Sequence, residues 1–473
     1  MGREKHFDSD NSDNPSVDLD ADSNSGNIQA TSAGRDAYVA GGDLTVVKLF
    51  INLVAGNRKT VAFNRTETIT VFAINFFICF ALVIARILGV FEDIELAHYD
   101  HLLQSRAEVG MEDQLVIISA SDRDYAQQDA EGESQKLGSY SDRELILLLQ
   151  KVLLNNPKAV GLDIFRPYGK SADPLYSLLK QEDKVVLVCE VEGFSGEGLK
   201  APDWIEKDQD RIGFNNFLYD YDQTVRRAYV GIEENKDSKC SSDFSFGFLL
   251  ALKYLNYDLS EISSPAQIED DRYNINILDK LLSPFYGAYQ GIDSSGFQVL
   301  IDYKPVHDKL ENLTDYKFDF SEVMDASFDA NIFTEKIVLI GISAETVAPS
   351  LVDTPYGQTN RISVQAHIVS DFIARMSQSK QDDRTLTTAS QPIILFFTFL
   401  MSSFSTILTI KLVNRQFLLV LFASFLEISL LLFSLIAMIL FNIWIPILII
   451  VISSIISIIS TQVYGLSLAK DVK

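Results

Sequence analysis

Acidic residues that follow predicted strands are the side chains best placed to do chemistry in this sequence. Asp122 and Asp163 each come just after a short apolar run, and Gly341 closes a third. Ligands of open α/β sheets gather at the carboxyl ends of parallel strands. A binding crevice at that edge, completed by Asp353 and His367, is therefore the site hypothesis. The alternative, which we favour for Asp163, is that its carboxylate caps a helix or closes a turn.

Nothing in the sequence predicts an enzyme, a cofactor or a metal centre. The histidines are scattered, and neither a Gly-rich phosphate loop nor a Ser nucleophile elbow follows a strand. The cysteines, Cys79, Cys189 and Cys240, lack the C-x-x-C or His/Cys grouping that zinc requires. A disulfide between Cys189 and Cys240 is one alternative. The other, which we favour, is a buried Cys189 and a free Cys240.

Charge excludes one class of partner and predicts one local structure. The formal net charge of −24 argues against a nucleic-acid partner, because phosphate binding needs a basic surface. Within the chain, Asp220 and Asp222 stand just before Arg226 and Arg227. This spacing favours an internal salt-bridged turn, which is more often structural than ligand-binding.

Short apolar runs alternate with amphipathic segments through the middle of the chain. Strands are predicted at 115–119, 159–164, 184–189, 225–231, 297–302 and 336–340, and helices at 142–154, 174–180, 244–254 and 363–376. The order of the first five elements, strand–helix–strand–helix–strand, is typical of a parallel sheet covered by helices. The fold class predicted for this region is therefore α/β with a mainly parallel sheet.

Long apolar runs predict four membrane helices, one before the α/β region and three after it. They lie at 68–90, 392–410, 417–440 and 445–464, and each has the length that a hydrocarbon core requires. Basic residues precede the first run and flank the turn at Lys411 and Arg415, and lysines end the chain. Because basic residues stay on the cytoplasmic side, we expect a multi-pass inner-membrane protein with both termini cytoplasmic. Residues 91–390 are then extracytoplasmic, and Trp444 is expected to be an outer interfacial anchor.

Two polar residues stand inside the predicted membrane helices. Asn75 lies in the first and Glu427 in the third. A carboxyl group is costly in lipid, so Glu427 should face other helices. Serines of the second helix are its expected partners: Ser402, Ser403 and Ser405. We favour a role in helix packing over ion passage.

The N-terminal region divides into two parts of different composition. Residues 1–25 form an acidic tail with almost no apolar residues and are expected to be disordered. Residues 26–47 hold a Gly/Asp repeat in which AGRDAYV is followed at once by AGGDLTV. Stacked chains could satisfy each other's strand edges here, through Gly34, Asp36, Tyr38, Val39, Gly41, Asp43, Leu44 and Val46. This stretch resembles short amyloid-signalling motifs of bacterial effectors, and the alternative is a flexible linker.

Four stretches of the α/β region together resemble a known family. They are AVGLDI at 159–164, IGFN at 212–215 with the following D-x-D and VRR, KIVLIG at 336–341 with the following D-T-P, and QAH at 365–367. This pattern resembles the CHASE domain, type two (cyclases/histidine kinases associated sensory extracellular). The resemblance implies an extracytoplasmic sensor inserted after one membrane helix and followed by about three more.

The chain departs from that family at several places. GSYS at 138–141 replaces an aromatic motif with proline, Ile362 and Ser363 replace Pro-Gly, and the first acidic residues are shifted to Ser121 and Asp122. These changes put the family's ligand in doubt. Relatives usually continue into a cyclase or kinase, whereas this sequence stops at Lys473, so we expect no catalytic output domain.

Two functions from different classes fit these features. The first is a non-enzymatic receptor in the lipid bilayer that binds an extracytoplasmic ligand and signals to a cytoplasmic partner or through self-assembly of its N-terminus. The second is a cell-death or immune-type membrane effector, triggered by amyloid-like assembly of residues 26–47. Deleting the repeat should leave ligand binding intact in the first and abolish toxicity in the second.

Overall fold

The computed structural model of the chain describes most of the sequence from residue 60 onward. The described residues are 60–106, 112–130, 140–165, 174–192, 198–200, 209–232, 239–240, 242–257, 282, 286–292, 296–304, 310–346, 351–377 and 386–471. The acidic tail (1–25) and the Gly/Asp repeat (26–47) lie outside these residues, so both remain sequence-based expectations.

A six-stranded sheet forms the centre of the α/β region. In spatial order its strands are β4 (Ile212–Phe214), β3 (Val185–Cys189), β2 (Ala159–Leu162), β9 (Ile337–Ile342), β1 (Leu115–Ala120) and β8 (Lys317–Asp319). All neighbouring strands run parallel, which confirms the predicted mainly parallel sheet. The central strands are buried almost throughout. Their continuous apolar runs follow from this, since helices cover both faces.

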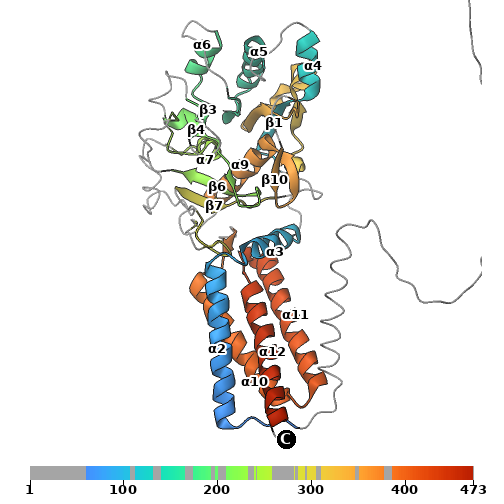
Figure 1. The fold of residues 1–473 in the computed structure, drawn as a ribbon. Coiled ribbons are helices and arrows are strands. Elements are labelled where there is room, and N and C mark those ends of the chain that lie inside the picture. The colour runs from blue at the N-terminus through green and yellow to red at the C-terminus, as the bar shows by residue number, and fades with distance from the viewer. Residues whose placement is uncertain are drawn as a thin grey trace, which may run out of the picture. The chain divides into compact units, whose positions relative to one another are not determined.

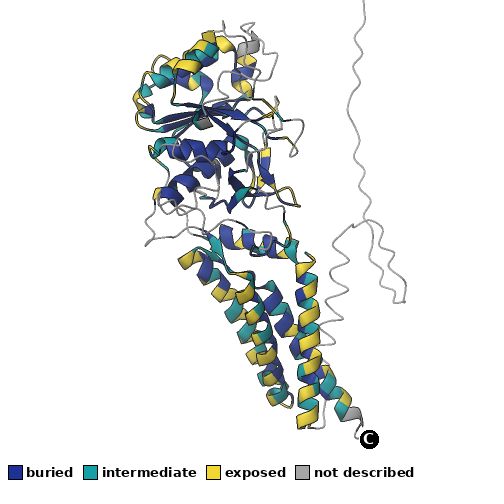
Figure 2. Cartoon of the chain, turned by 90° about the vertical axis from the view of Figure 1, so that its left-hand side faces the viewer, coloured by how far each residue is buried: buried dark blue, intermediate teal, exposed yellow. Residues whose placement is uncertain are grey.

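Helices cover the two faces of the sheet, and alternate strand residues point into two separate cores. In β1, Val116 and Ile118 face the core that includes residues of α5 (Asp142–Leu153) and α6 (Pro174–Gln181). Leu115 and Ile117 face the core of α7 (Phe246–Tyr254) and α9 (Arg361–Ser377). Figure 2 shows the buried sheet between these helical layers. Shorter helices are α4 (Asp122–Ala130), α8 (Phe320–Met324) and the 3-10 turns Gln209–Arg211, Leu310–Asn312 and Ala330–Phe333.

A smaller antiparallel sheet shares the core of α7 and α9. Its strands are β5 (Leu218–Tyr219), β6 (Val225–Gly231) and β7 (Phe297–Leu300). A separate hairpin, β10 (Leu351–Thr354) and β11 (Gly357–Asn360), leads directly into α9. In Figure 1 the smaller sheet lies between the parallel sheet and the long helices.

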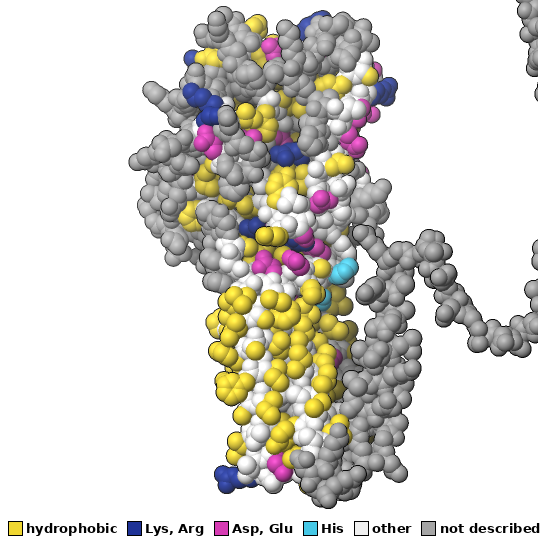
Figure 3. Space-filling model, in the orientation of Figure 1, with side chains coloured by type: hydrophobic (Ala, Val, Ile, Leu, Met, Phe, Trp, Pro, Cys, Tyr) yellow, Lys and Arg dark blue, Asp and Glu magenta, His cyan; other side chains and the backbone are white. Residues whose placement is uncertain are grey.

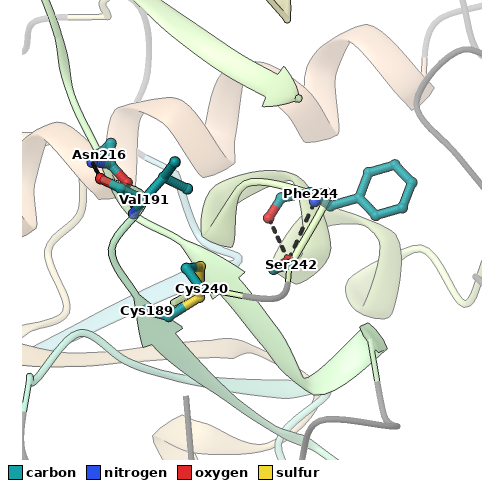
Figure 4. Close-up of a disulfide and its surroundings, with 6 residues drawn as sticks. All are labelled: Cys189, Val191, Asn216, Cys240, Ser242 and Phe244. Carbon is teal, nitrogen blue, oxygen red and sulfur yellow. Dashed lines mark hydrogen bonds between the residues drawn. A yellow bond between two sulfur atoms is a disulfide. The ribbon is translucent and has the colours of Figure 1, made fainter. Parts of the chain in front are cut away.

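A disulfide joins Cys189 to Cys240, so the free Cys240 that we favoured from the sequence is wrong. Cys189 ends β3, and the segment around Cys240 runs back past β4, where the Phe214 N–H donates to the carbonyl of Phe244 at 3.2 Å. This pairing brings the two Cα atoms to 5.4 Å, well within the range that a disulfide spans. Figure 4 shows the bond beside the short turn formed by Ser242 and Phe244.

Among the described residues, four helices are long and apolar enough to cross a membrane. They are α2 (Arg65–Ile87), α10 (Gln391–Leu412), α11 (Gln416–Phe441) and α12 (Leu448–Asp471). They lie side by side in Figure 1, and hydrophobic side chains predominate on the face of these helices that Figure 3 shows. The first begins at Arg65, earlier than the predicted residue 68, because Asn64 and Glu67 form a capping box that satisfies its first N–H groups.

α3 (Glu92–Gln104) follows α2 almost at once and, like the shorter α4 and α8, was not predicted from the sequence. Its buried face contains Leu96, Tyr99 and Leu103, which join the core of α7 and α9. Their helical spacing was a usable signal, but it lies in a segment rich in charged and polar residues. Figure 1 places α3 between the long helices and the α/β region.

Polar side chains link the long helices to one another. Asn75 of α2 donates to hydroxyls of α10 and α12, at 2.7 Å to Thr406 and 3.0 Å to Thr461. Glu427 accepts from Ser454 of α12 at 2.6 Å. The expected partners on α10 are thus wrong for Glu427, although Ser405 does bond Ser454 at 2.7 Å. The contacts stabilise helix packing, because such groups cannot bond to water within lipid.

Candidate functional site

Three of the five predicted site residues lie along one edge of the parallel sheet. Strands β2, β9 and β1 are neighbours, so Asp163, Gly341 and Asp122 stand in that order at their carboxyl ends. Asp122 opens α4 and accepts from the backbone N–H groups of Glu345 and Thr346, at 3.3 and 3.2 Å. Hydrogen bonds from the Thr346 hydroxyl and backbone lower the pKa of Asp122. Asp122 therefore fastens the segment after β9 to the start of α4.

Gly341 allows α9 to pack closely against the sheet. It pairs with Ser119 in the ladder between β9 and β1. A Cβ atom at Gly341 would lie 2.7 Å from the side chain of Ile362 in the first turn of α9. The observed role of Gly341 is thus to make room for the start of this helix.

Asp163 is held by a residue from another strand end. Its carboxylate accepts from Nδ2 of Asn215, which follows β4, and its backbone N–H donates to the carbonyl of Ile340 at 2.8 Å. Burial raises the pKa of Asp163, and the positive charge of Arg361 acts in the opposite direction. The turn or cap that we favoured for Asp163 is not among its described contacts.

Asp353 and His367 make their described contacts with other parts of the fold. Asp353 lies exposed in β10, paired with Gln358 of β11. His367 is buried midway along α9, where Nε2 contacts the carbonyl of Leu310 at 2.9 Å and Nδ1 accepts from the Lys304 N–H at 3.4 Å. The grouping of all five residues in one crevice is therefore not what the structure shows.

The buried imidazole of His367 predicts acid sensitivity. Burial lowers its pKa to about 4, despite an opposing effect of the hydrogen bond to Leu310. The unfolded chain then takes up a proton near pH 6.5, before the folded chain does, so stability is lost as pH falls from there towards 4. We expect His367 to remove about 2 kcal/mol of stability between pH 7 and pH 5.

The measurement is the free energy of unfolding of wild type and His367→Gln at both pH values. Glutamine can still donate to Leu310 but does not titrate, so the difference between the two proteins should change by about 2 kcal/mol over this range. A difference that is the same at both pH values contradicts a buried neutral imidazole.

An ionic cluster, defined as Asp100, Asp220, Asp222, Arg226 and Arg227, joins α3 to the smaller sheet. The buried guanidinium of Arg226 bonds Asp220 at 3.0 Å, Asp222 at 2.7 Å and Asp100 at 2.7 Å. Arg227 bonds Asp220 at 2.8 Å. The predicted salt-bridged turn is thus confirmed. Asp100 was not predicted to join this turn, because it comes from α3, far away in the chain.

The charges of the ionic cluster stabilise one another within the protein. Burial raises the pKa of Asp100, and its bonds to Arg226 oppose that shift. Burial alone would lower the pKa of Arg226, but its hydrogen bonds to Asp100 and Asp222 raise it overall. Separating α3 from β6 would therefore leave the Asp100 carboxylate without its cation.

A second buried ion pair lies where the long helices meet the α/β region. Arg86, in the last turn of α2, bonds Glu95 of α3 at 3.1 Å and Gln391 of α10 at 2.7 Å. It also donates to the carbonyl of Gly287 at 2.6 Å, as does Gln391 at 2.8 Å. We call these residues the junction anchor: Arg86, Glu95, Gly287 and Gln391. A lone arginine near the end of an apolar helix was the signal for it, but the sequence did not identify its partners.

Trp444 completes the junction from the other side. It lies between α11 and α12 in β13 (Ile443–Trp444), which pairs with β12 (Thr387–Thr388) just before α10. Its ring packs against Tyr99 of α3 and Tyr289, with ring centres 4.6 and 6.4 Å apart. Trp444 is fully buried, so the expected interfacial anchor is instead a packing centre inside the protein.

The described fold is an α/β domain that lies between the first and second of four helices long and apolar enough to cross a membrane. Within the described residues, no group of His, Cys, Asp or Glu is arranged to hold a metal ion. Residues 77–408 match the family model described as the CHASE2 domain. Because this match covers well over half of the sequence, the chain belongs to the CHASE2 domain family, a family of sensory extracellular domains. No curated protein and no solved structure matches the chain.

Proposed function

We propose that this protein is a membrane-bound sensory receptor. Its α/β domain detects an extracytoplasmic signal and passes the change across the membrane through α2 and α10. The observation that carries the proposal is the junction anchor, in which Arg86 binds α3, α10 and the Gly287 carbonyl together. Helix α2, which leads into the domain, and helix α10, which leads out of it, are therefore joined through the Arg86 guanidinium. A movement of α3 or of the loop with Gly287 therefore acts on both helices at once.

Helix α9 supplies a route from the sheet edge towards this junction. Its first turn packs on β9, and near its other end Arg375 donates to the carbonyl of Leu300 at 2.6 Å. Asp371 accepts from the backbone N–H of Asp302 at 3.3 Å, and Asp302 in turn pairs with Arg106, just beyond α3. These are contiguous packed contacts that a shift of α9 would disturb.

The first test concerns the side of the membrane on which the domain lies. Tyr221→Cys places a thiol at a side chain that is 97% exposed, and Ser467→Cys places one at an exposed position near the end of α12. We expect a membrane-impermeant maleimide to label Tyr221→Cys in intact cells and Ser467→Cys only after permeabilisation. The reverse pattern would place the domain in the cytoplasm and end the receptor proposal.

The second test concerns the junction anchor. Arg86→Gln leaves the Glu95 carboxylate buried without a cation, which typically costs about 3–5 kcal/mol of stability. The double variant Arg86→Gln with Glu95→Gln removes both charges and should recover much of that loss. The measurement is thermal unfolding of the full chain in detergent for both single variants and the double variant. If the stability loss of the double variant equals the sum of the losses of the two single variants, the two side chains do not interact.

A further inference from the structure

Several buried polar atoms at the carboxyl edge of the parallel sheet have no hydrogen-bond partner. Asn215 is 3% exposed and Ser363 is 1% exposed, yet Asn215 Oδ1 and Ser363 Oγ are both unpartnered. The side-chain oxygens of Thr359 and Asn360, at the end of β11, are unpartnered as well. Buried polar atoms are nearly always satisfied by protein, water or ligand. Such a group of unsatisfied atoms therefore points to a bound molecule.

These atoms come from elements that meet at one place. Asn215 donates through Nδ2 to the carboxylate of Asp163, so the Asn215 side-chain amide is directed at that carboxylate. Gln365 of α9 reaches the backbone carbonyl of Asn215 at 3.5 Å. Thr359 and Asn360 immediately precede Arg361, the first residue of α9. The ends of β2 and β4 and the start of α9 thus form one site.

Arg361 has no ion-pair partner among the described residues. Its guanidinium lies 4.5 Å from the centre of the Phe217 ring. Burial raises the pKa values of Asp163 and Glu190, and the positive charge of Arg361 opposes that shift. A cation in the first turn of a helix is unfavourable, because the helix dipole is positive there. An anion bound at Arg361 would remove this conflict and could accept from backbone N–H groups of the first turn.

The two halves of the site have opposite preferences. Arg361 and the first turn of α9 favour an anionic group. Asn215 Oδ1 and the ionised Asp163 carboxylate accept hydrogen bonds only, so they favour a cationic donor, which would also keep Asp163 ionised. We propose that this edge binds a small zwitterion of the α-amino acid class, with its carboxylate at Arg361 and its ammonium group at Asp163 and Asn215. The proposal rests on the receptor function and names the class of ligand for it.

The position of the site fits a receptor. The ligand would contact the first turn of α9, and the far end of the same helix holds Leu300 and Asp302 through Arg375 and Asp371. Occupation of the site therefore acts on the element that leads towards the junction anchor.

The experiment is calorimetric titration of the purified full chain in lipid nanodiscs with a set of L-amino acids. For each amino acid that binds, the matched amine without the carboxylate and the matched acid without the ammonium group are also titrated. We expect at least one amino acid to bind, and both matched compounds to bind at least tenfold more weakly. Arg361→Gln and Asp163→Asn should each weaken binding at least tenfold, whereas Arg65→Gln, at the start of α2, should not.

Several results would overturn the proposal. They are an absence of binding by every amino acid, equal binding of the acid that lacks the ammonium group, and unchanged binding by Arg361→Gln. If Arg361→Gln does not fold, Arg361→Lys keeps the charge but loses the planar fork of donors, and it should still weaken binding. Binding to purified protein does not depend on membrane orientation, so this result is separate from that of the maleimide labelling.

Discussion

Replacing Arg226 with methionine is expected to lower the free energy of unfolding of the α/β domain by about 3–5 kcal/mol. Arg226 is 1% exposed and bonds three carboxylates, from Asp100, Asp220 and Asp222. Without the guanidinium these charges remain together, and only Asp220 keeps a cation, Arg227. Denaturant unfolding of the full chain in detergent, followed by circular dichroism, measures the loss.

The control for Arg226→Met is Lys158→Met, which breaks a partly exposed ion pair with Glu335, 2.9 Å long. Such pairs contribute about 0–1 kcal/mol, so the control variant should unfold almost like the wild type. Equal effects of the two substitutions would mean that the ionic cluster does not hold α3 to the smaller sheet.

Removing the disulfide is expected to cost about 4 kcal/mol of stability. The bond joins residues 51 positions apart, and the chain-entropy estimate for a closed loop of this length is about 4 kcal/mol. Cys189→Ala with Cys240→Ala should therefore unfold at a clearly lower denaturant concentration than the wild type.

A reducing agent provides the matched comparison for the disulfide. It should destabilise the wild type by a similar amount and leave the double alanine variant unchanged. If the reductant frees both thiols of the wild type without lowering its stability, the loop closed by the bond contributes nothing to the folded domain.

The parallel sheet could be predicted because its strands are continuous apolar runs separated by amphipathic helices. That signal depends only on local sequence, and it located β1, β2, β3 and β9 to within a few residues. Helix α3 was missed because its apolar face is narrow and its other residues are charged. The disulfide was considered but not favoured, because the approach of Cys240 to Cys189 depends on β4 and Phe244, which no local pattern shows.

The candidate site was predictable only in part, for a similar reason. Asp163 was correctly placed at the carboxyl end of a parallel strand, because it directly follows the apolar run that forms β2. Its partner Asn215 and the facing Arg361 come from distant segments, and they are brought together by the way α9 packs on the sheet. His367 was included with Asp163 in the site hypothesis, yet it is buried midway along α9, where its ring contacts the backbone of Leu310 and Lys304.

The position of Arg86 has a consequence for the lipid. Its charge is already matched by Glu95 within the protein, so α2 needs no headgroup phosphate at this level. In a bilayer, the Arg86 guanidinium would therefore stay paired within the protein whatever the headgroup composition. A thicker or thinner bilayer must be accommodated elsewhere, by tilting or by local lipid deformation. The helix most exposed to that adjustment is α11, because only 11% of its most apolar stretch of 18 residues is buried in the protein.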